Sequence, residues 1–198
     1  REGFLIPIIK GWSTELAQEI TSNGVQIHGG MGFIEETGAA QYMRDARILP
    51  IYEGTNAIQA NDFMFRKTVR DNGKTAKELL NEIKIDCEDN FEMSEMVNLT
   101  SKCLNYILEN RDDQEILSCI SFDYLMGFGY LVGGWLMDKA KISANKQLSK
   151  SSRNKVFLKS KIVSAEFYDF HILPRIEYHF KVVMKGAKVV KTTNDSFI

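Results

Sequence analysis

Apolar residues recur at steps of three and four along most of the chain, which is the period of an amphipathic helix. The first such run predicts one apolar helix face, made of Leu5, Ile9, Trp12, Leu16 and Ile20. Pro7 is compatible with that helix only in its first turns or at a kink. Asn23 and Gly24 offer a left-handed cap, so the helix is expected to end there.

A glycine-rich stretch, residues 26–33, follows and predicts a loop. A second helix is expected to begin at Thr37 and to end at Pro50, with ion pairs on or near it from Arg44, Asp45 and Arg47. A third helix, capped by Thr55 or Asn56, is expected to run to about Arg70. Its apolar contacts are expected from Ile58, Phe63, Phe65 and Val69.

The turn signal Asp71-Asn72-Gly73 is the best domain boundary in the chain. Beyond it, helical periodicity predicts further helices over 75–85, 92–109, from Asp112 or Asp113 to about 144, and 153–190 with a break at Pro174. Strand alternation is absent from the pattern. We therefore predict an all-α fold in two parts, a helical domain over 1–73 and a second helical bundle over 74–198, with a frayed tail from residue 191.

The second bundle is expected to be structural. Its apolar stripe is expected to continue across the bend at Pro174, through Phe167, Phe170, Leu173 and Ile176. The stretch Gly127-Phe128-Gly129-Tyr130-Leu131-Val132-Gly133-Gly134 resembles a dinucleotide loop, but it lies inside a helical pattern and lacks a preceding strand. Small residues that let helices pack closely are the favoured interpretation.

The charge of the chain and its distribution argue against a nucleic-acid-binding function. The formal net charge is -1, which gives no overall attraction to nucleic acid. Residues 78–95 hold seven acids against one lysine, and residues 139–161 hold eight Lys or Arg and no acid. The two runs could face each other, but solvated faces are the favoured interpretation. The basic run also lacks the interleaved aromatic residues of a nucleic-acid stacking surface.

The remaining composition points to a soluble protein in a reducing compartment, and a cytoplasmic location is expected. Three cysteines form no close pair and are interpreted as free thiols. No apolar run is expected to reach the length of a membrane span. The three histidines are too scattered to predict a metal site. The chain opens on Arg1 without an initiator methionine, so it is expected to be a C-terminal part of a longer protein.

Candidate chemistry gathers in two clusters, residues 26–33 and 51–56. Glycines let a backbone approach a ligand closely, and a helix N-terminus offers free N–H groups. Glu53 stands at such a helix mouth, before Gly54. Taken alone, Glu53 is more simply an acid favoured by the helix dipole than a catalytic group. An acid beside free donors can also act as a base while its neighbours hold an oxyanion.

Three stretches resemble, in the same order, the C-terminal helical domain of the flavin-dependent acyl-CoA dehydrogenases. They are Q-x-x-G-G-x-G-[FY] at 26–33, M-R-D-A-R at 43–47 and I-Y-E-G-T-x-x-I-Q at 51–59. Residues beyond about 70 are similar to the extra helical region of a long subgroup of that family. That second resemblance rests on patterns such as A-E-F-Y-D-F-H-I-L-P at 165–174.

The resemblance implies an FAD-dependent enzyme that oxidises an acyl-CoA to a trans-2-enoyl-CoA and passes electrons to an electron-transfer flavoprotein. It implies that Glu53 removes the α-proton while the β-hydrogen leaves as hydride to the flavin. Removal from water would make such a carboxylate more basic. Gly54 would leave room for the thioester, and Tyr52 would line the same slot or pack.

The same resemblance implies that Gln26, Gly29, Gly30 and Thr55 contact FAD. In the family the glycine loop reaches a cofactor across a subunit interface, which implies a homodimer or homotetramer. Many relatives carry an arginine where this chain has Ala60, and whether Arg66 takes over its contact to CoA stays open. An acyl-CoA oxidase and a non-catalytic helical interaction module stay open as alternatives.

Overall fold

The computed structural model describes residues 1–150 and 154–193, and every regular element in that part of the chain is a helix. The all-α prediction is thus confirmed. In chain order the elements are α1 (Glu2–Ile27), α2 (Gly30–Phe33), η1 (Glu35–Thr37), α3 (Ala39–Ala46), α4 (Asn56–Asn61), η2 (Asp62–Val69), α5 (Lys74–Asp86), α6 (Phe91–Glu109), α7 (Gln114–Leu148), α8 (Lys155–Phe167), η3 (Tyr168–Ile172), α9 (Arg175–Lys185) and α10 (Ala187–Thr192).

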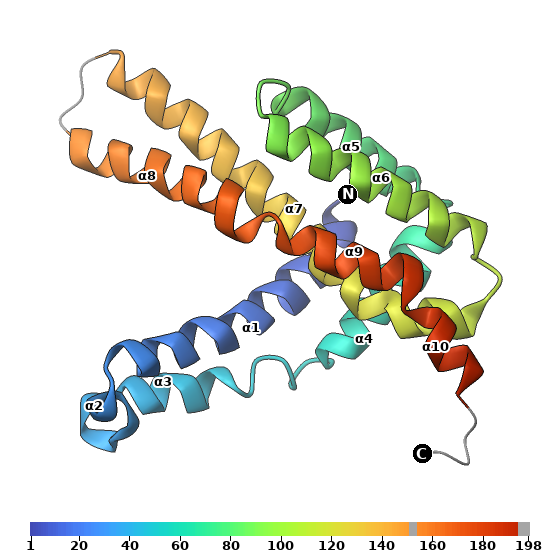
Figure 1. Ribbon diagram of the computed structural model, residues 1–198, viewed down its shortest axis with the longest axis horizontal. Coiled ribbons are helices and arrows are strands. Elements are labelled where there is room, and N and C mark those ends of the chain that lie inside the picture. The colour runs from blue at the N-terminus through green and yellow to red at the C-terminus, as the bar shows by residue number, and fades with distance from the viewer. Residues whose placement is uncertain (151–153, 194–198) are drawn as a thin grey trace.

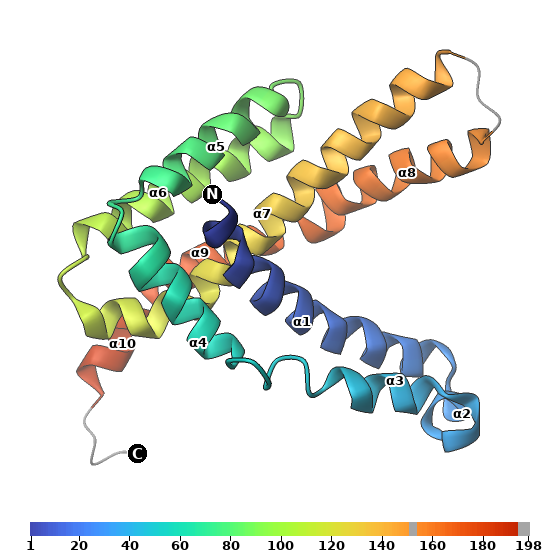
Figure 2. The same ribbon diagram turned by 180° about the vertical axis from the view of Figure 1, so that it is seen from behind.

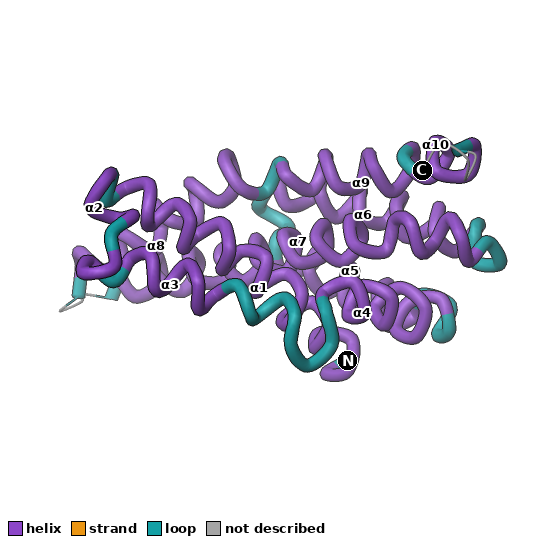
Figure 3. Tube along the Cα trace, turned by 90° about the horizontal axis from the view of Figure 1, so that it is seen from below, coloured by secondary structure: helices purple, strands orange, loops and turns teal. Residues whose placement is uncertain are grey.

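Three pairs of helices diverge from a common centre. Figures 1 and 2 show α1 with α3 as one arm, α5 with α6 as a second and α7 with α8 as a third, while α9 crosses the centre. Seen from below, a loop without regular structure joins α3 to α4 (Figure 3). This loop carries the Tyr52–Thr55 turn.

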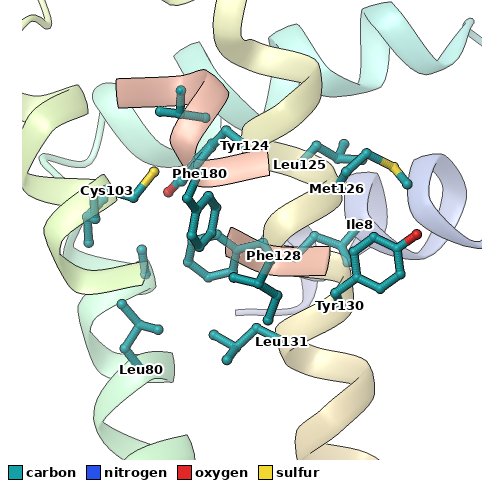
Figure 4. Close-up of a cluster of buried hydrophobic side chains, with 14 of the residues drawn as sticks. Ile8, Leu80, Cys103, Tyr124, Leu125, Met126, Phe128, Tyr130, Leu131 and Phe180 are labelled. Atoms are coloured by element: carbon teal, nitrogen blue, oxygen red, sulfur yellow. The ribbon is translucent and has the colours of Figure 1, made fainter. Parts of the chain in front are cut away.

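The 35-residue helix α7 forms the middle of the core. Its fully buried rings Tyr124 and Phe128 contact Phe63 from η2, and Phe128 also contacts Phe4 from α1. Figure 4 shows Tyr124 and Phe128 with Phe180 of α9 beside them. Helices from both halves of the chain therefore share one core. The turn at 71–73 is present, with positive φ at Asn72 and Gly73, but the division into two domains at that turn stays a prediction.

Glycines of α7 let α9, α1, α6 and the turn at Leu173 approach closely. An added Cβ at Gly127 would overlap Phe180, and one at Gly129 would overlap Trp12. At Gly134 it would lie 2.7 Å from Met93 Sδ and 2.8 Å from a Leu173 methyl carbon. The interpretation of residues 127–134 as a helix-packing surface, and not as a dinucleotide loop, is confirmed.

The first helix is longer than the sequence predicted and presents a different face. It runs to Ile27, and the positive φ that ends it belongs to Gly29, not to Asn23 or Gly24. The core takes Phe4, Ile8 and Gly11, whereas Ile9 and Ile20 are exposed. The predicted apolar face was therefore wrong in part, because α1 carries apolar residues on more than one side of the helix.

The predicted start of the second helix was two residues early, because Thr37 closes the 3₁₀ turn η1 and Gly38 adopts a φ of 78°. Arg44 pairs with Glu35, but Asp45 and Arg47 make no ion pair with the described residues. The third helix does run to Val69, as α4 followed by the π-helical η2. Ile58 is exposed on it, contrary to the prediction.

The last helices break at Pro174 as predicted, and the expected frayed tail lies largely outside the described residues. The apolar stripe predicted across the break at Pro174 was wrong in part, however. Leu173 and Ile176 are buried, but Phe167 and Phe170 face outward. Phe170 itself lies in the π-helical turn η3, between Phe167 and Leu173, and the wider i→i+5 spacing of this turn shifts the register of the stripe.

Helix α7 is long and apolar enough to pass a length-and-composition test for a membrane span, so the expectation that no run reaches that length was wrong. Of its most apolar window, 61% is buried among the other helices, which is the behaviour of a central core helix. Among the described residues the charged runs meet at one ion pair, where Lys139 Nζ lies 2.8 Å from Asp86 Oδ2. A second pair joins α9 to α1, since Arg175 binds both carboxylate oxygens of Glu19 at 2.6 and 2.7 Å.

Candidate active site at the Tyr52–Thr55 turn

The turn before α4 has an unusual backbone. Glu53 has a φ of 52° and Gly54 a φ of 87°. A positive φ is uncommon for a residue with a side chain, and such strain persists only where the surroundings hold it. Thr55 then caps α4, its hydroxyl accepting from the Ile58 N–H at 3.4 Å, which confirms Thr55 as the predicted cap.

The amides of this turn are available. Within the described part of the chain, the N–H groups of Glu53, Gly54 and Thr55 donate to no other group, whereas the next amide, that of Asn56, donates to the Pro50 carbonyl at 3.0 Å. Tyr52, Glu53, Gly54 and Thr55 are all exposed. Nothing in the described residues therefore withdraws the Glu53 carboxylate from water, and the desolvated base that the resemblance implies stays a prediction.

Helix α1 is hydrogen-bonded to this turn. Lys10 Nζ donates to the Gly54 carbonyl at 2.7 Å and to Asn56 Oδ1 at 2.8 Å. Asn56 is only 4% exposed, and its Nδ2 lies 2.8 Å from both Thr14 Oγ1 and Glu15 Oε1. The turn is thus tied to one side of α1 by a buried amide and a lysine.

The lysine is partly withdrawn from water. Burial lowers the pKa of the Lys10 ammonium, and the negative charges of Glu15 and Glu53 oppose that shift. The Lys10 ammonium, which hydrogen-bonds the backbone of this turn, therefore also interacts with the charge of Glu53. Sequence reasoning named Asn56 only as a possible helix cap and missed Lys10, because their contact joins residues 46 positions apart.

The glycine-rich cluster lies far from this turn. Residues 26–33 close the other end of α1, and the 16 residues between Lys10 and Gln26 span about 24 Å of helix. Gln26, Gly29 and Gly30 are exposed. Within one chain they lie at the far end of the α1–α3 arm, by α2, away from the start of α4 (Figure 1).

The glycines of this cluster differ in what they permit. Gly29 requires its positive φ of 60°. Gly32, which the sequence did not single out, is buried where a Cβ would overlap the Val25 carbonyl. Around Gly30 an added Cβ would meet nothing within 4 Å. The loop predicted over residues 26–33 was wrong in part, because α1 runs to Ile27 and α2 begins at Gly30, which leaves only a turn at His28 and Gly29.

Arg66 lies on η2, beyond α4. It borders an open hollow of about 500 Å³ that also includes Gln59 and Lys67, and it pairs with Asp62 at 3.0 Å. Gln59 connects this hollow to the turn, since its Nε2 lies 3.5 Å from the Glu53 carbonyl. In the described part of the chain, no group of three or more His, Cys, Asp or Glu side chains is arranged to hold a metal ion.

Comparison with known proteins gives two family matches. Residues 2–66 match the family described as "Acyl-CoA dehydrogenase, C-terminal domain". Residues 80–193, more than half of the chain, match the description "Acetyl-CoA dehydrogenase C-terminal like".

Individual relatives agree. The chain is 40% identical over 185 residues to a 3-methylmercaptopropionyl-CoA dehydrogenase of Ruegeria pomeroyi, covering 86% of this chain and 31% of that protein. It is 31% identical to a butyryl-CoA dehydrogenase of Syntrophomonas wolfei, covering 95% of this chain and 32% of the relative. It is 28% identical to a broad-specificity linear acyl-CoA dehydrogenase of Mycobacterium tuberculosis, covering 86% and 31%. The chain spans about a third of the length of these relatives. On these matches, the chain belongs to the acyl-CoA dehydrogenase family.

Proposed function

We propose that this chain supplies the catalytic base of an FAD-dependent enzyme that oxidises an acyl-CoA to a trans-2-enoyl-CoA. The observation that carries the proposal is the turn before α4, where Glu53 and Gly54 adopt positive φ and three consecutive amides have no acceptor among the described residues. The enzymes named among the relatives are acyl-CoA dehydrogenases of differing acyl groups, so the acyl chain is left open.

The α-proton of a thioester is weakly acidic, so a base needs help at the carbonyl oxygen. Glu53 accepts that proton at its carboxylate, and the free Glu53 amide donates to the thioester oxygen as negative charge develops there. Gly54, with no side chain, leaves room for the thioester next to the base. Tyr52 is exposed beside them and offers a flat wall to the acyl chain. Bound acyl-CoA would itself cover Glu53 and remove water from it.

FAD, when bound, supplies the acceptor for the β-hydride. Thr55 is exposed at the same turn and offers a hydroxyl toward that cofactor. Gln26, Gly29 and Gly30 would hold a cofactor belonging to a second copy, because about 24 Å of α1 separates them from this turn in their own chain. This arrangement supports a homodimer or homotetramer. We further propose a cytoplasmic enzyme that delivers its electrons to an electron-transfer flavoprotein.

The test is Glu53→Gln in the full-length protein that carries this chain. The amide keeps the size of the side chain but cannot accept the proton. The variant should retain bound flavin, seen by its visible absorbance, and should lose nearly all flavin reduction by acyl-CoA under anaerobic conditions. Flavin reduction at the wild-type rate would show that Glu53 is not the base. Stoichiometric hydrogen peroxide during turnover in air would favour an acyl-CoA oxidase.

A further inference from the structure

We infer that Lys10 and Asn56 are positioning residues for the proposed reaction: together they fix the strained Glu53–Thr55 backbone against α1. The inference rests on the function proposed above and adds a requirement to it, namely that α1 supplies the support of the catalytic turn. Neither residue belongs to the motif positions that identify the base and the cofactor loop.

The Lys10 ammonium makes two hydrogen bonds to the turn. Lys10 Nζ donates to the Gly54 carbonyl at 2.7 Å, and this carbonyl belongs to the peptide that joins Gly54 to Thr55. Without this bond the carbonyl would be free to turn, because a glycine crosses between backbone regions at little cost. Lys10 also binds Asn56 Oδ1 at 2.8 Å, so a single ammonium spans both sides of Thr55.

The side chain of Asn56 is buried against α1. Its side-chain nitrogen is surrounded by acceptors of α1, namely Thr14 Oγ1 and Glu15 Oε1 at 2.8 Å and the Gly11 carbonyl at 3.2 Å. A buried amide with satisfied donors fixes one arrangement, because breaking it would leave polar groups unpaired. The Asn56 N–H meanwhile binds the Pro50 carbonyl at 3.0 Å, which closes the turn from its other end.

These contacts leave Glu53 in a φ that side chains avoid, and they leave its amide pointing at no protein acceptor. Proton removal needs the carboxylate and the amide donor to meet the same thioester at once. A shift of about 1 Å in such an arrangement can cost about 100-fold in rate. Loss of the Lys10 contact should therefore slow the chemical step rather than weaken acyl-CoA binding.

The experiment compares Lys10→Met, which keeps length and loses the donors, with Lys10→Arg, which keeps charge and donors. In the full-length protein, Lys10→Met should lower the rate of flavin reduction about 100-fold with little change in KM. Lys10→Arg should recover most of that loss. Lys84→Met on the exposed side of α5 is the matched control and should behave as wild type.

A second readout needs neither flavin nor substrate. The amides of Asn56 and Gln59 donate to Pro50 and Thr55 at 3.0 Å, so their hydrogen exchange reports whether the turn stays closed. Exchange at both should accelerate in Lys10→Met and in Asn56→Asp, whose carboxylate cannot donate to Glu15. Exchange in the helix α6 should stay unchanged if the fold is intact.

The outcomes separate the two ideas. If Glu53→Gln abolishes flavin reduction but Lys10→Met leaves both rate and exchange unchanged, the positioning role is wrong and the proposed base stands. If Glu53→Gln is fully active, the proposed base itself is wrong. If Lys10→Met raises KM and leaves the reduction rate intact, Lys10 contributes to binding and not to positioning, which also overturns the inference.

Discussion

Trp12 on α1 lies directly across Gly129 on α7, so that a Cβ at position 129 would overlap its indole ring. The indole also meets Tyr130 edge-on, with ring centroids 5.7 Å apart. Helix α1, which carries the support of the Glu53 turn, therefore rests on α7 through a contact that tolerates no side chain at 129. The stability of α1, and of the Glu53 turn that it supports, is thus coupled to α7.

Gly129→Ala should destabilise the protein, because the added methyl must displace an indole held between two helices. Overpacking of this kind costs about 1–3 kcal/mol. Urea denaturation followed by circular dichroism measures it. Gly24→Ala is the matched control, since that glycine lies inside α1 with open space around it and should gain up to about 1 kcal/mol of helix propensity. Equal effects of the two substitutions would contradict the packing role.

A partly buried amide, that of Asn90, joins three elements at the end of the α5–α6 arm. Asn90 caps α6, accepting from the Met93 N–H, and this fixes its Nδ2 toward two carboxylates. That nitrogen lies 3.0 Å from Asp138 Oδ1 and 3.2 Å from Asp169 Oδ2. Asp169 is 5% exposed, and its other oxygen has no hydrogen-bond partner in the part of the chain that the structure describes.

This cluster predicts a pH dependence of stability. Burial raises the pKa of Asp169, the bond from Asn90 and the charge of Lys141 oppose the rise, and the charges of Asp138 and Glu92 add to it. The folded state thus holds the proton more tightly than the unfolded state, whose pKa is about 3.9. The contribution of Asp169 to stability is full below about pH 4 and is lost as pH rises through its folded pKa.

Asp169→Asn removes that titration and keeps the size of the side chain. Relative to wild type, the variant should therefore become progressively more stable as pH rises from 4 to 8. Thermal unfolding at several pH values gives the difference, and the exposed Asp89→Asn controls for net charge. A stability difference that stays constant across this range would show that Asp169 does not titrate abnormally.

The cysteines should differ sharply in reactivity. Cys119 is exposed, whereas Cys87 and Cys103 are buried. Burial is the main cause that raises the pKa of Cys87 to about 12, with the negative charge of Asp138 adding to it, and burial also raises the pKa of Cys103. Because the thiolate is the reactive form, native protein should consume one equivalent of a thiol reagent at pH 8 and three in denaturant. Cys119→Ser should abolish the native reaction. Reaction of two or three native thiols at the same rate would contradict the burial.

The sequence predicted the helices because their signal is local. Asp113 and Thr55 cap the helices that they were expected to cap, and Pro174 breaks the last one. It could not predict the burial of Asn56, since the residues that surround it are more than 40 positions away on α1. Nor could it predict where α1 ends, because both Gly24 and Gly29 can adopt positive φ and only the packing of residues 25–32 decides between them.

The outer face of α8 and η3 was predicted wrongly for a different reason. A strict helical period places Phe170 in line with Leu173 and Ile176, and the π-helical turn Tyr168–Ile172 breaks that period. Asp169, next to Phe170, takes the inward position instead and meets Asn90. Periodicity alone does not reveal a π-helical turn, so the direction of Phe170 had to come from the structure.

Phe170 and Leu173 therefore offer a matched pair of substitutions. Phe170 is 65% exposed and Leu173 is 1% exposed, only three residues apart. Leu173→Ala removes buried methyl groups beside Gly134 and should cost about 2–5 kcal/mol of unfolding free energy. Phe170→Asp changes a side chain that faces away from the core and should stay within about 0.5 kcal/mol of wild type in a monomeric chain.

Urea denaturation at low protein concentration measures both variants, and sedimentation velocity at high concentration shows whether the exposed face is used between copies. A wild-type assembly that Phe170→Asp dissociates without changing monomer stability would place the α8 face in a subunit interface. A loss of several kcal/mol in the dilute Phe170→Asp monomer would instead show that Phe170 packs inside the chain. The outward direction that the π-helical turn gives it would then be wrong.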